Sequence, residues 1–543
     1  MLQKVATTGI DLNNVYDQTL RRIKEQQGDR SRLGMEVLMW ISHAERPLQI
    51  DELCHALAVE MGATDLDLEN LRPQDTVLRS CFGLAVVDKE TSKVRLIHYT
   101  LQEYLSRPGV LPGAHRTLGQ KCLTYLNYVQ VKRLPADNTS NLKNMPFLEY
   151  SSLHWGVHAK TELSDYAKSL ALELLNQYDS HISSRLLFER IEDPWSRPPS
   201  HRPFPGLHCA AYFGIDEILA TLIAMEGCDI NQGDYKKFTP LVRASQKGNQ
   251  GAVMLLLARD DVNPDKPGYD GETPLWWASR NGHEGVARLL LARDDVNPGK
   301  PKNQGQTPLC TASRNGHEGV VGLLLTRNDV DPHKPDNHGQ TPLWRASFHG
   351  HDGVVRLLIA RSDVNPNQPS YKGETPLWRA SCNGHQGVLR LLLARDDVNP
   401  DKPDNDGITP LQCALSEGHE GVVKLLHSRS GINPEQSDNN SLTPLPSASS
   451  DMHEEVARTP VARDDVTPDE PDNDDITSLQ PASSNGHEGV VRPPVARGDV
   501  DPYEQDNSSQ PPPKISSIRK YRRIIAEHVP RLWGKNKKGK ERL

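Results

Sequence analysis

Histidine–glutamate pairs are the first residues of this 543-residue chain that suggest chemistry, because both side chains can bind zinc or move protons. The pairs begin at His283, His317, His419 and His487. A zinc-peptidase helix needs a second His four residues after the first, and none of these pairs has one. The pairs recur at whole multiples of one interval, so we interpret the His column as duplicated scaffold rather than as a metal site.

Other catalytic signatures are also missing from the sequence. It contains no G-x-S-x-G nucleophile elbow and no G-x-x-x-x-G-K-[ST] phosphate loop. We therefore predict no enzyme, no catalytic residue, no bound metal and no cofactor. The net charge of −8 gives no sign of nucleic-acid binding, and no apolar run approaches the ~18 residues of a membrane span.

Composition also indicates a cellular compartment and an incomplete core. The eight cysteines form no C-x-x-C pair, which predicts free thiols in a reducing environment. The first residues lack the apolar stretch of a secretory signal, so we expect a cytoplasmic protein. Only 36% of residues are hydrophobic and 41 are proline, which indicates that part of the chain forms no packed core.

A 34-residue period governs the middle of the chain. Thr-Pro recurs at one constant interval, at positions 239, 273, 307, 341, 375, 409 and 443. In one unit Thr273 can cap a helix, Pro274 suits its first turn, and Gly282 suits a left-handed helix end. A second helix with an apolar face and an extended, proline-bounded finger follow. Such units bury their apolar faces only by stacking, so the period predicts a solenoid.

These units resemble the ankyrin repeat, whose pattern is T-P-L-H-x-A. The period is one residue longer here, and the His of that pattern survives only as His208. Because that His makes a local hydrogen bond in the family, we expect the repeats that lack it to be less stable than consensus ankyrin repeats. We interpret three tryptophans at its position as a packed ladder, with ligand contact as the alternative; they are Trp276, Trp344 and Trp378.

The ankyrin resemblance implies a protein partner on the concave face, contacted by the ends of the first helices and by the fingers. The helix-end candidates are Arg280, Asn281, Arg314, Asn315, Phe348, His349, Cys382 and Asn383. The finger candidates are Tyr269, Glu272, Gln304, Gln306, His338, Gln340, Lys372 and Glu374. These columns vary between units whose Leu, Ala and Gly stay fixed, as expected if scaffold and contact residues are separate.

Residues 1–130 do not follow the repeat. Apolar periodicity predicts helices at 12–27, 35–44, 50–57, 76–82 and 100–106. Two β-rich runs, 83–88 and 93–98, flank a turn and predict a hairpin. Three helices followed by a two-stranded wing predict a small α+β winged-helix domain. Its 49–75 segment holds seven acidic residues and one basic residue, Arg72, so we regard a DNA-binding regulator as a weak alternative.

This N-terminal segment resembles the winged-helix module of NACHT-type signalling ATPases. The resemblance rests mainly on the run from Arg95 to Leu105, with Gly9–Asp11, Ala44–Leu48 and Asp51–Leu53. It implies that His98 would sense nucleotide phosphates. Eight residues precede the match and no phosphate loop follows, so we expect no ATPase motor here and favour a structural role for His98. A helical connector at 131–200, also typical of that family, is predicted before the repeats.

The C-terminal part divides by charge and composition. We predict seven foldable repeats over 205–434 and two degenerate, disordered repeats over 435–513, where prolines replace the core leucines. The 514–543 tail carries 11 Lys or Arg against two Glu, which suggests a solvated tail, nuclear import or weak contact with an anionic surface.

These predictions describe a mainly α protein-interaction scaffold: a winged-helix domain, a connector, an ankyrin-type solenoid and a disordered tail. We expect it to be the sensor arm of a NACHT-like or NLR-like signalling protein that lacks its ATPase. The alternative is a part of an NTP-regulated receptor that acts only with a separate motor chain.

Overall fold

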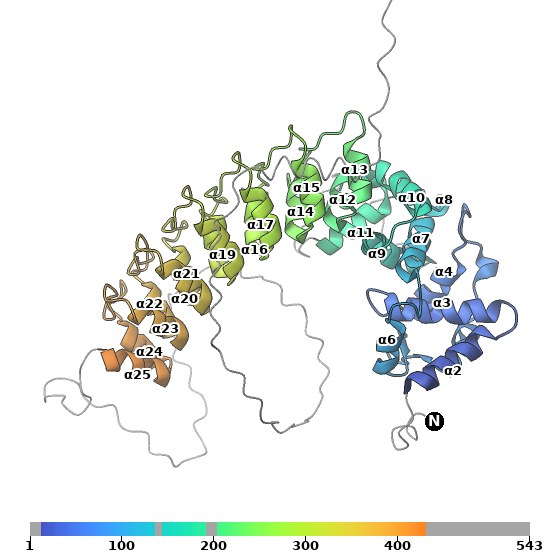
Figure 1. Ribbon diagram of the computed structural model, residues 1–543, viewed down its shortest axis with the longest axis horizontal. Helices are drawn as coiled ribbons and strands as arrows, with labels where there is room; N and C mark the ends of the chain where they lie inside the picture. The colour runs from blue at the N-terminus through green and yellow to red at the C-terminus, as the bar shows by residue number, and fades with distance from the viewer. Residues whose placement is uncertain (1–11, 136–143, 192–203, 430–543) are drawn as a thin grey trace, which may run out of the picture. The chain divides into compact units, whose positions relative to one another are not determined.

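The computed structural model describes residues 12–135, 144–191 and 204–429 (Figure 1). The predicted degenerate repeats at 435–513 and the basic tail at 514–543 lie outside these ranges. The N-terminal elements are the helices α2 (Leu12–Lys24), α3 (Asp29–His43), α4 (Ile50–Ala58), α5 (Gln74–Arg79) and α6 (Tyr99–Leu105), with a short 3-10 turn at Leu68–Asn70 and the strands β1 (Ala85–Val87) and β2 (Val94–Leu96).

The predicted helices and hairpin of the winged-helix domain are confirmed. Strands β1 and β2 pair antiparallel, with Ala85 opposite Leu96. Helix α3 begins six residues before its predicted start, at Asp29, and its Trp40 is fully buried. Glu52 accepts two hydrogen bonds from the Arg46 guanidinium and one from the backbone N–H of Gln49. This buried carboxylate therefore fixes the start of α4.

Among the described residues, five further helices follow α6 before the repeats begin. Their bounds are α7 (Ala114–Leu126), α8 (Val129–Lys132), α9 (Phe147–Thr161), α10 (Asp165–Asn176) and α11 (Ile182–Ile191), with a 3-10 turn at Tyr178–Ser180. Helix α9 packs closely along α7. Phe147 of α9 meets the Trp40 ring edge-on, with ring centroids 5.4 Å apart. We call helices α9 to α11 the connector.

Seven helix pairs form the repeat array. Their first helices are α12 (Gly206–Phe213), α14 (Pro240–Lys247), α16 (Pro274–Arg280), α18 (Pro308–Arg314), α20 (Pro342–His349), α22 (Pro376–Cys382) and α24 (Pro410–Ser416). Their second helices are α13 (Asp216–Ile223), α15 (Gln250–Leu257), α17 (Glu284–Leu291), α19 (Glu318–Leu325), α21 (Asp352–Ile359), α23 (Gln386–Leu393) and α25 (Glu420–Arg429). First helices pack on first helices and second on second, so the pairs follow one another in two rows (Figure 1).

The Thr-Pro dipeptides start the first helices as predicted. In each repeat from Thr239 to Thr409, the Thr hydroxyl accepts the backbone N–H three residues later, and Pro occupies the first helical turn. Such a cap satisfies a donor that the helix itself leaves unpaired. Leu275 and Leu290, one on each helix of the third pair, are fully buried. Capping and apolar burial thus reinforce each other in every unit.

The recurring Gly-His dipeptide joins neighbouring repeats. Gly316 lies in the turn between α18 and α19, with φ +75°. A Cβ at this position would lie 2.7 Å from Nδ1 of His351 in the next repeat. His351 in turn donates from Nε2 to the backbone carbonyl of Arg314, at 2.8 Å. His283, His317, His385 and His419 make the same bond one repeat back. The scaffold interpretation of the His column is therefore confirmed.

An arginine just after the second helix joins the repeats on the other side in the second to sixth helix pairs. Arg327 pairs with Asp329 through both Nε and Nη2 and also donates from Nη1 to the carbonyl of Leu291, at 3.0 Å. Arg259, Arg293, Arg361 and Arg395 repeat this arrangement. Each arginine thus satisfies a carbonyl that the preceding second helix leaves open.

Two cysteines correct the prediction that all eight are free thiols. Cys382, at the end of α22, forms a disulfide with Cys413 of α24, with Cα atoms 5.2 Å apart. Among the described residues, the other six cysteines are free. The two partners belong to neighbouring repeats, and their spacing along the chain is not one that sequence inspection associates with pairing.

None of the helices in the described ranges combines the length and the apolar character that crossing a membrane requires.

Candidate protein-binding surface

The helix-end candidates are only half accessible. Arg280, Arg314, Phe348 and His349 are half-buried. The Arg280 guanidinium lies 5.5 Å from the ring centroids of both Trp276 and Trp277. Phe348 stacks on Trp344, with centroids 5.4 Å apart. These side chains therefore pack on the scaffold as well as offering one edge to solvent.

The asparagines of the helix-end column bridge repeats. Asn281 donates from Nδ2 to the carbonyl of Gln246 at 2.8 Å, and Asn315 to the carbonyl of Arg280 at the same distance. Asn383 donates to the carbonyl of Phe348 at 2.7 Å. Because each Nδ2 holds the helix end of the preceding repeat, a structural role accounts for this part of the column.

Three predicted contact residues are buried, which corrects their assignment to a binding surface. Cys382 is closed off by its disulfide. Glu374 is 5% exposed and receives two hydrogen bonds from Arg379, at 2.8 and 3.0 Å. Gln306 is 4% exposed. The sequence places these residues by their column alone, whereas Glu374 and Gln306 are buried in their fingers and Cys382 is bonded to Cys413 of the next repeat.

The remaining finger candidates are accessible to different degrees. Tyr269, His338 and Lys372 are exposed, and Tyr269 keeps 49% of its surface in solvent. Three others are half-buried, namely Glu272, Gln304 and Gln340. Burial, opposed by hydrogen bonds from backbone N–H groups, raises the pKa of Glu272. The exposed members of the finger column are thus an aromatic, an imidazole and an ammonium group.

The tryptophan ladder is a packed feature, as the sequence suggested. Trp276 and Trp344 are each 2% exposed. The Trp344 Nε1–H donates to the carbonyl of Glu374, and that of Trp378 to the carbonyl of Ile408. Arg379 lies over the Trp344 ring, 5.4 Å from its centroid. The alternative, contact with a ligand, is disfavoured because these tryptophans expose little surface to solvent.

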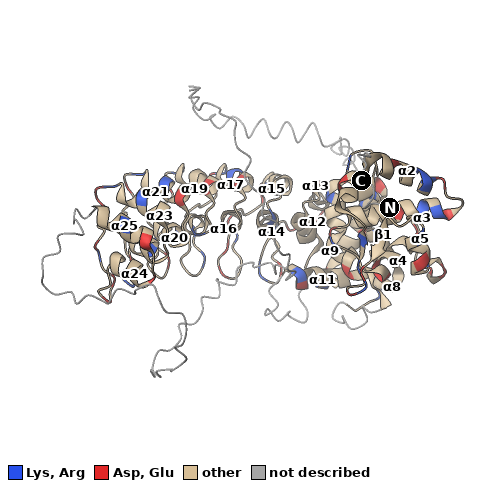
Figure 2. Ribbon diagram, turned by 90° about the horizontal axis from the view of Figure 1, so that it is seen from below, with Lys and Arg blue, Asp and Glu red and all other residues tan. Residues whose placement is uncertain are grey.

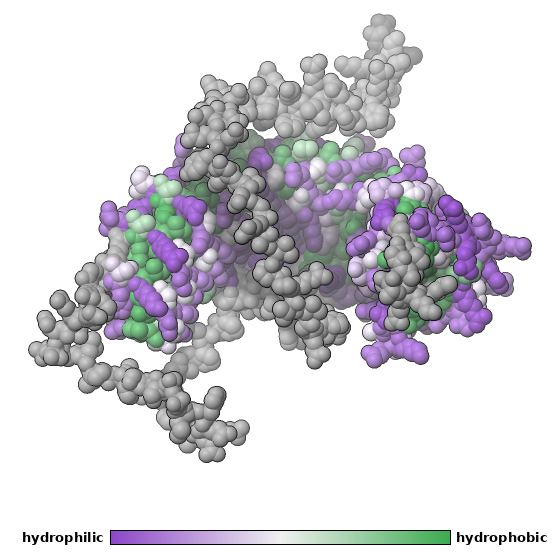
Figure 3. All heavy atoms as spheres, turned by 60° about the horizontal axis from the view of Figure 1, so that its bottom comes forward, coloured by the Kyte–Doolittle hydropathy of each residue, from purple (hydrophilic) through white to green (hydrophobic). Residues whose placement is uncertain are grey.

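Exposed apolar side chains near the array's end were missed by sequence reasoning. Tyr371 of the fifth finger, which follows α21, is 71% exposed, Leu415 of α24 57% and Ile408 42%. Apolar surface is visible over helices α22 to α25, on the left of Figure 3. The equivalents of Leu415 and Ile408 one repeat earlier, Ser381 and Glu374, are buried, so the repeat pattern gives no sign that these two positions are exposed in the last repeat.

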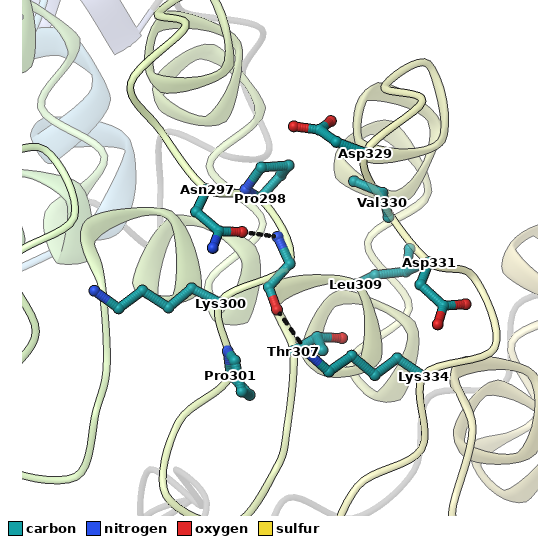
Figure 4. A pocket seen from close by; sticks show the side chains of 11 residues that line it. Asn297, Pro298, Lys300, Pro301, Thr307, Leu309, Asp329, Val330, Asp331 and Lys334 are labelled. Atoms are coloured by element: carbon teal, nitrogen blue, oxygen red, sulfur yellow. Dashed lines mark hydrogen bonds between the residues drawn. The ribbon is translucent and has the colours of Figure 1, made fainter.

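A pocket of about 230 Å³ lies between the third and fourth fingers (Figure 4). Lys300, Lys334, Asp329 and Asp331 are among the residues that line it. Lys334 donates from Nζ to the carbonyl of Gly299 at 3.3 Å, while Asp329 pairs with Arg327. Lys300 donates to a carbonyl one finger back. The polar groups of this pocket thus serve the scaffold.

His98 lies at the junction between strand β2 and helix α6. Its Nδ1 accepts the backbone N–H of Thr100 at 3.3 Å and lies 2.8 Å from the Thr100 hydroxyl. The ring is exposed and packs against Tyr99, with centroids 4.6 Å apart. His98 therefore caps α6, the structural role favoured by the sequence.

Charge along the described helices alternates rather than forming a single-sign face. Figure 2 shows Lys and Arg interspersed with Asp and Glu on both the winged-helix helices and the repeats. Neither sign forms a continuous face on the described helices in that view.

The comparisons agree with this architecture. The family model for ankyrin repeats (3 copies) matches residues 207–300, 293–370 and 354–438. The model for the winged-helix domain of GPI inositol-deacylase matches residues 22–111. A search of curated proteins found no match.

Two solved structures are similar to the repeat region. The crystal structure of the human ASB11 ankyrin repeat domain is 24% identical, covering 44% of this chain and all of that one, with a TM-score of 0.37. The crystal structure of the ankyrin repeat domain of Bcl-3, a member of the IkappaB protein family, is also 24% identical, with a TM-score of 0.36. It covers 41% of this chain and 97% of that one. The chain thus contains an array of ankyrin repeats and an N-terminal winged-helix domain.

Proposed function

We propose that this chain is a protein-interaction scaffold whose ankyrin fingers bind a protein partner. One observation carries the proposal: Tyr269, His338, Tyr371 and Lys372 are exposed on fingers whose neighbouring residues are buried or hydrogen-bonded to the next repeat. Exposed aromatic side chains in a rigid frame suit protein recognition, because they supply contact area at low entropic cost. The contact surface we propose is therefore the finger surface, defined by these four residues.

We further propose that the chain acts as the sensor arm of a NACHT-like signalling assembly. The support is the winged-helix match at 22–111 together with the adjoining connector and repeats. In such an assembly the repeats would select the partner and the winged-helix domain would transmit its binding. The nucleotide-dependent step would belong to a separate motor chain.

The finger surface can be tested by substitution in the full chain. We expect the triple variant Tyr269→Ala, His338→Ala, Lys372→Ala to lose captured partners that the parent retains in quantitative affinity capture. The matched control removes three exposed cations from second helices, by Arg356→Ala, Arg390→Ala and Lys424→Ala. Equal capture by the parent and the finger variant, or equal loss from both variants, would contradict the assignment.

A further inference from the structure

Three potential metal ligands meet where the winged-helix region packs on the connector. Glu45 follows helix α3, His115 lies in the first turn of α7, and His158 lies in α9. Their ligand atoms all lie within 4.8 Å of one another. The Nδ1 atoms of the two histidines are 2.9 Å apart. Glu45 is exposed, His115 half-buried and His158 fully buried, so the group is open to solvent on the carboxylate side.

A second layer of contacts fixes the orientation of the buried imidazole. Nε2 of His158 lies 2.9 Å from the hydroxyl of Tyr150, itself fully buried. That hydroxyl also accepts the backbone N–H of Glu45 at 3.1 Å. If Nε2 carries the proton and donates to Tyr150, Nδ1 presents its lone pair toward His115. Outer partners of this kind commonly set the tautomer of a metal-binding histidine.

We propose that Glu45, His115 and His158 form a binding site for a zinc ion that joins the α3–α4 loop, α7 and α9. Two imidazoles and one carboxylate are a ligand set that Zn²⁺ accepts, with water in the fourth position. At zinc–ligand bonds of about 2.0–2.1 Å, tetrahedral ligands stand roughly 3.4 Å apart. The two Nδ1 atoms, 2.9 Å apart, would have to separate by about half an ångström, and the exposed side chain of Glu45 can move to complete the ligand set.

Aromatic and imidazole rings pack around the two histidines. His43 lies against His115, with ring centroids 5.5 Å apart, and His154 packs on Tyr150 at 4.7 Å. Zinc binds the neutral form of an imidazole. The distance of 2.9 Å between the two Nδ1 atoms also fits a hydrogen bond in which one ring donates its N–H to the other. A plain hydrogen bond is therefore the competing explanation that the experiment must exclude.

Metal sites that can be predicted from a sequence have ligands at short, regular spacing. The three ligands here are far apart along the chain, at positions 45, 115 and 158, which is why we predicted no metal from the sequence. They meet because α7 and α9 pack side by side with the α3–α4 loop at their ends. Only tertiary structure brings them together.

The test titrates the metal-free full chain with Zn²⁺ alone and follows heat and thermal stability. We expect one saturable site per chain and a rise in the melting temperature that grows with zinc concentration. Glu45→Gln and His115→Gln should each weaken zinc binding at least tenfold. Both replaced side chains are at least partly accessible, so the variants should fold, which circular dichroism checks.

His98→Gln is the matched control, because His98 is an exposed histidine of the same half of the chain that lies outside the cluster. It should bind zinc like the parent. Co²⁺ added in place of Zn²⁺ should give the absorption bands of a tetrahedral site in the parent and not in Glu45→Gln. The proposal is overturned if the parent shows no saturable site, if the two ligand variants bind zinc like the parent, or if the control loses binding to the same extent.

Discussion

The indole N–H of Trp344 donates to the backbone carbonyl of Glu374, thirty residues along the chain, at an Nε1–O distance of 3.1 Å. His208 makes the equivalent bond from Nε2 to Phe238 at 2.9 Å. Trp378 makes it to Ile408 at 2.8 Å. Tryptophan thus replaces the consensus histidine and keeps its bond to the next finger. We expected the repeats of Trp344 and Trp378 to be less stable because they lack this histidine, and the tryptophan hydrogen bonds remove that reason.

We predict that Trp344→Phe lowers the free energy of unfolding by about 1–3 kcal/mol more than Trp276→Phe. Both changes remove similar volume from buried sites. Only the first removes a hydrogen bond, because the Trp276 Nε1 has no partner among the described residues. Chemical denaturation of the two variants measures the difference. Equal losses would show that the Trp344 bond contributes nothing to stability.

Substitution of two glycines should separate backbone strain from repeat-to-repeat packing. Gly316 and Gly418 share nearly the same backbone, at φ +75° and +73°. A Cβ at Gly316 would meet the His351 ring, whereas one at Gly418 would meet no atom of the described residues within 4 Å. We therefore predict that Gly316→Ala destabilises the array more than Gly418→Ala, which carries only the left-handed strain of about 1–2 kcal/mol.

The comparison is made by thermal and chemical unfolding of both variants. His351→Ala gives a further check, since it empties the space beside Gly316 and removes the bond to Arg314. In the His351→Ala background, Gly316→Ala should lower the free energy of unfolding by no more than Gly418→Ala lowers it in the parent. A persistent difference would mean that His351 is not the obstacle.

The fold was predictable where local signals repeat. Left-handed glycines and leucine faces recur in every described unit, and Thr-Pro caps recur in every unit after the first, so the same local signals predict the same structure several times over. The candidate surface was less predictable, because a column of the repeat fixes position and not side-chain direction. Glu374 illustrates this: Arg379, five residues later, draws its carboxylate inward. Hydrogen bonds between repeats, such as that from Asn315 to the carbonyl of Arg280, could be predicted only if the packing of neighbouring repeats were already known.

A buried ion pair should prove far more sensitive to substitution than an exposed one of equal length. Arg345–Asp336 and Arg327–Asp329 both have Nη2–Oδ2 distances of 2.8 Å. The Asp336 side chain is fully buried, whereas that of Asp329 is 51% exposed. We predict that Asp336→Ala costs about 3–5 kcal/mol, because it leaves a guanidinium uncompensated.

Asp329→Ala should cost no more than about 1 kcal/mol, as is typical of exposed pairs. Equilibrium unfolding of both variants in urea gives the two values. Asp336 also accepts the backbone N–H groups of His338 and Gln340, both at 2.9 Å, so the finger turn should loosen with it. Similar costs for the two variants would show that burial does not control the strength of these pairs.

The finger aspartates should make the array sensitive to acid. Hydrogen bonds from the partner arginines, ahead of all other causes, hold the pKa values of Asp295, Asp329, Asp363 and Asp397 below the ordinary value of 3.8. A carboxylate whose pKa is lower in the folded state contributes stability above its unfolded pKa. That contribution is lost as pH falls through the folded pKa. These pairs should therefore stabilise the array fully near neutral pH and progressively less below about pH 4.

Replacing Asp295, Asp329 and Asp363 together with Asn isolates this effect from that of other carboxylates. Asn keeps an oxygen acceptor for the arginine but cannot carry the charge. We expect the triple variant to melt below the parent at pH 6, and the gap between the two melting temperatures to narrow as pH falls below about 3.8 toward the lowered pKa of the folded aspartates. Added salt at pH 6 should narrow the same gap, because exposed pairs are screened. A gap that stays constant from pH 6 to pH 3 would show that the charge of these aspartates does not stabilise the repeats.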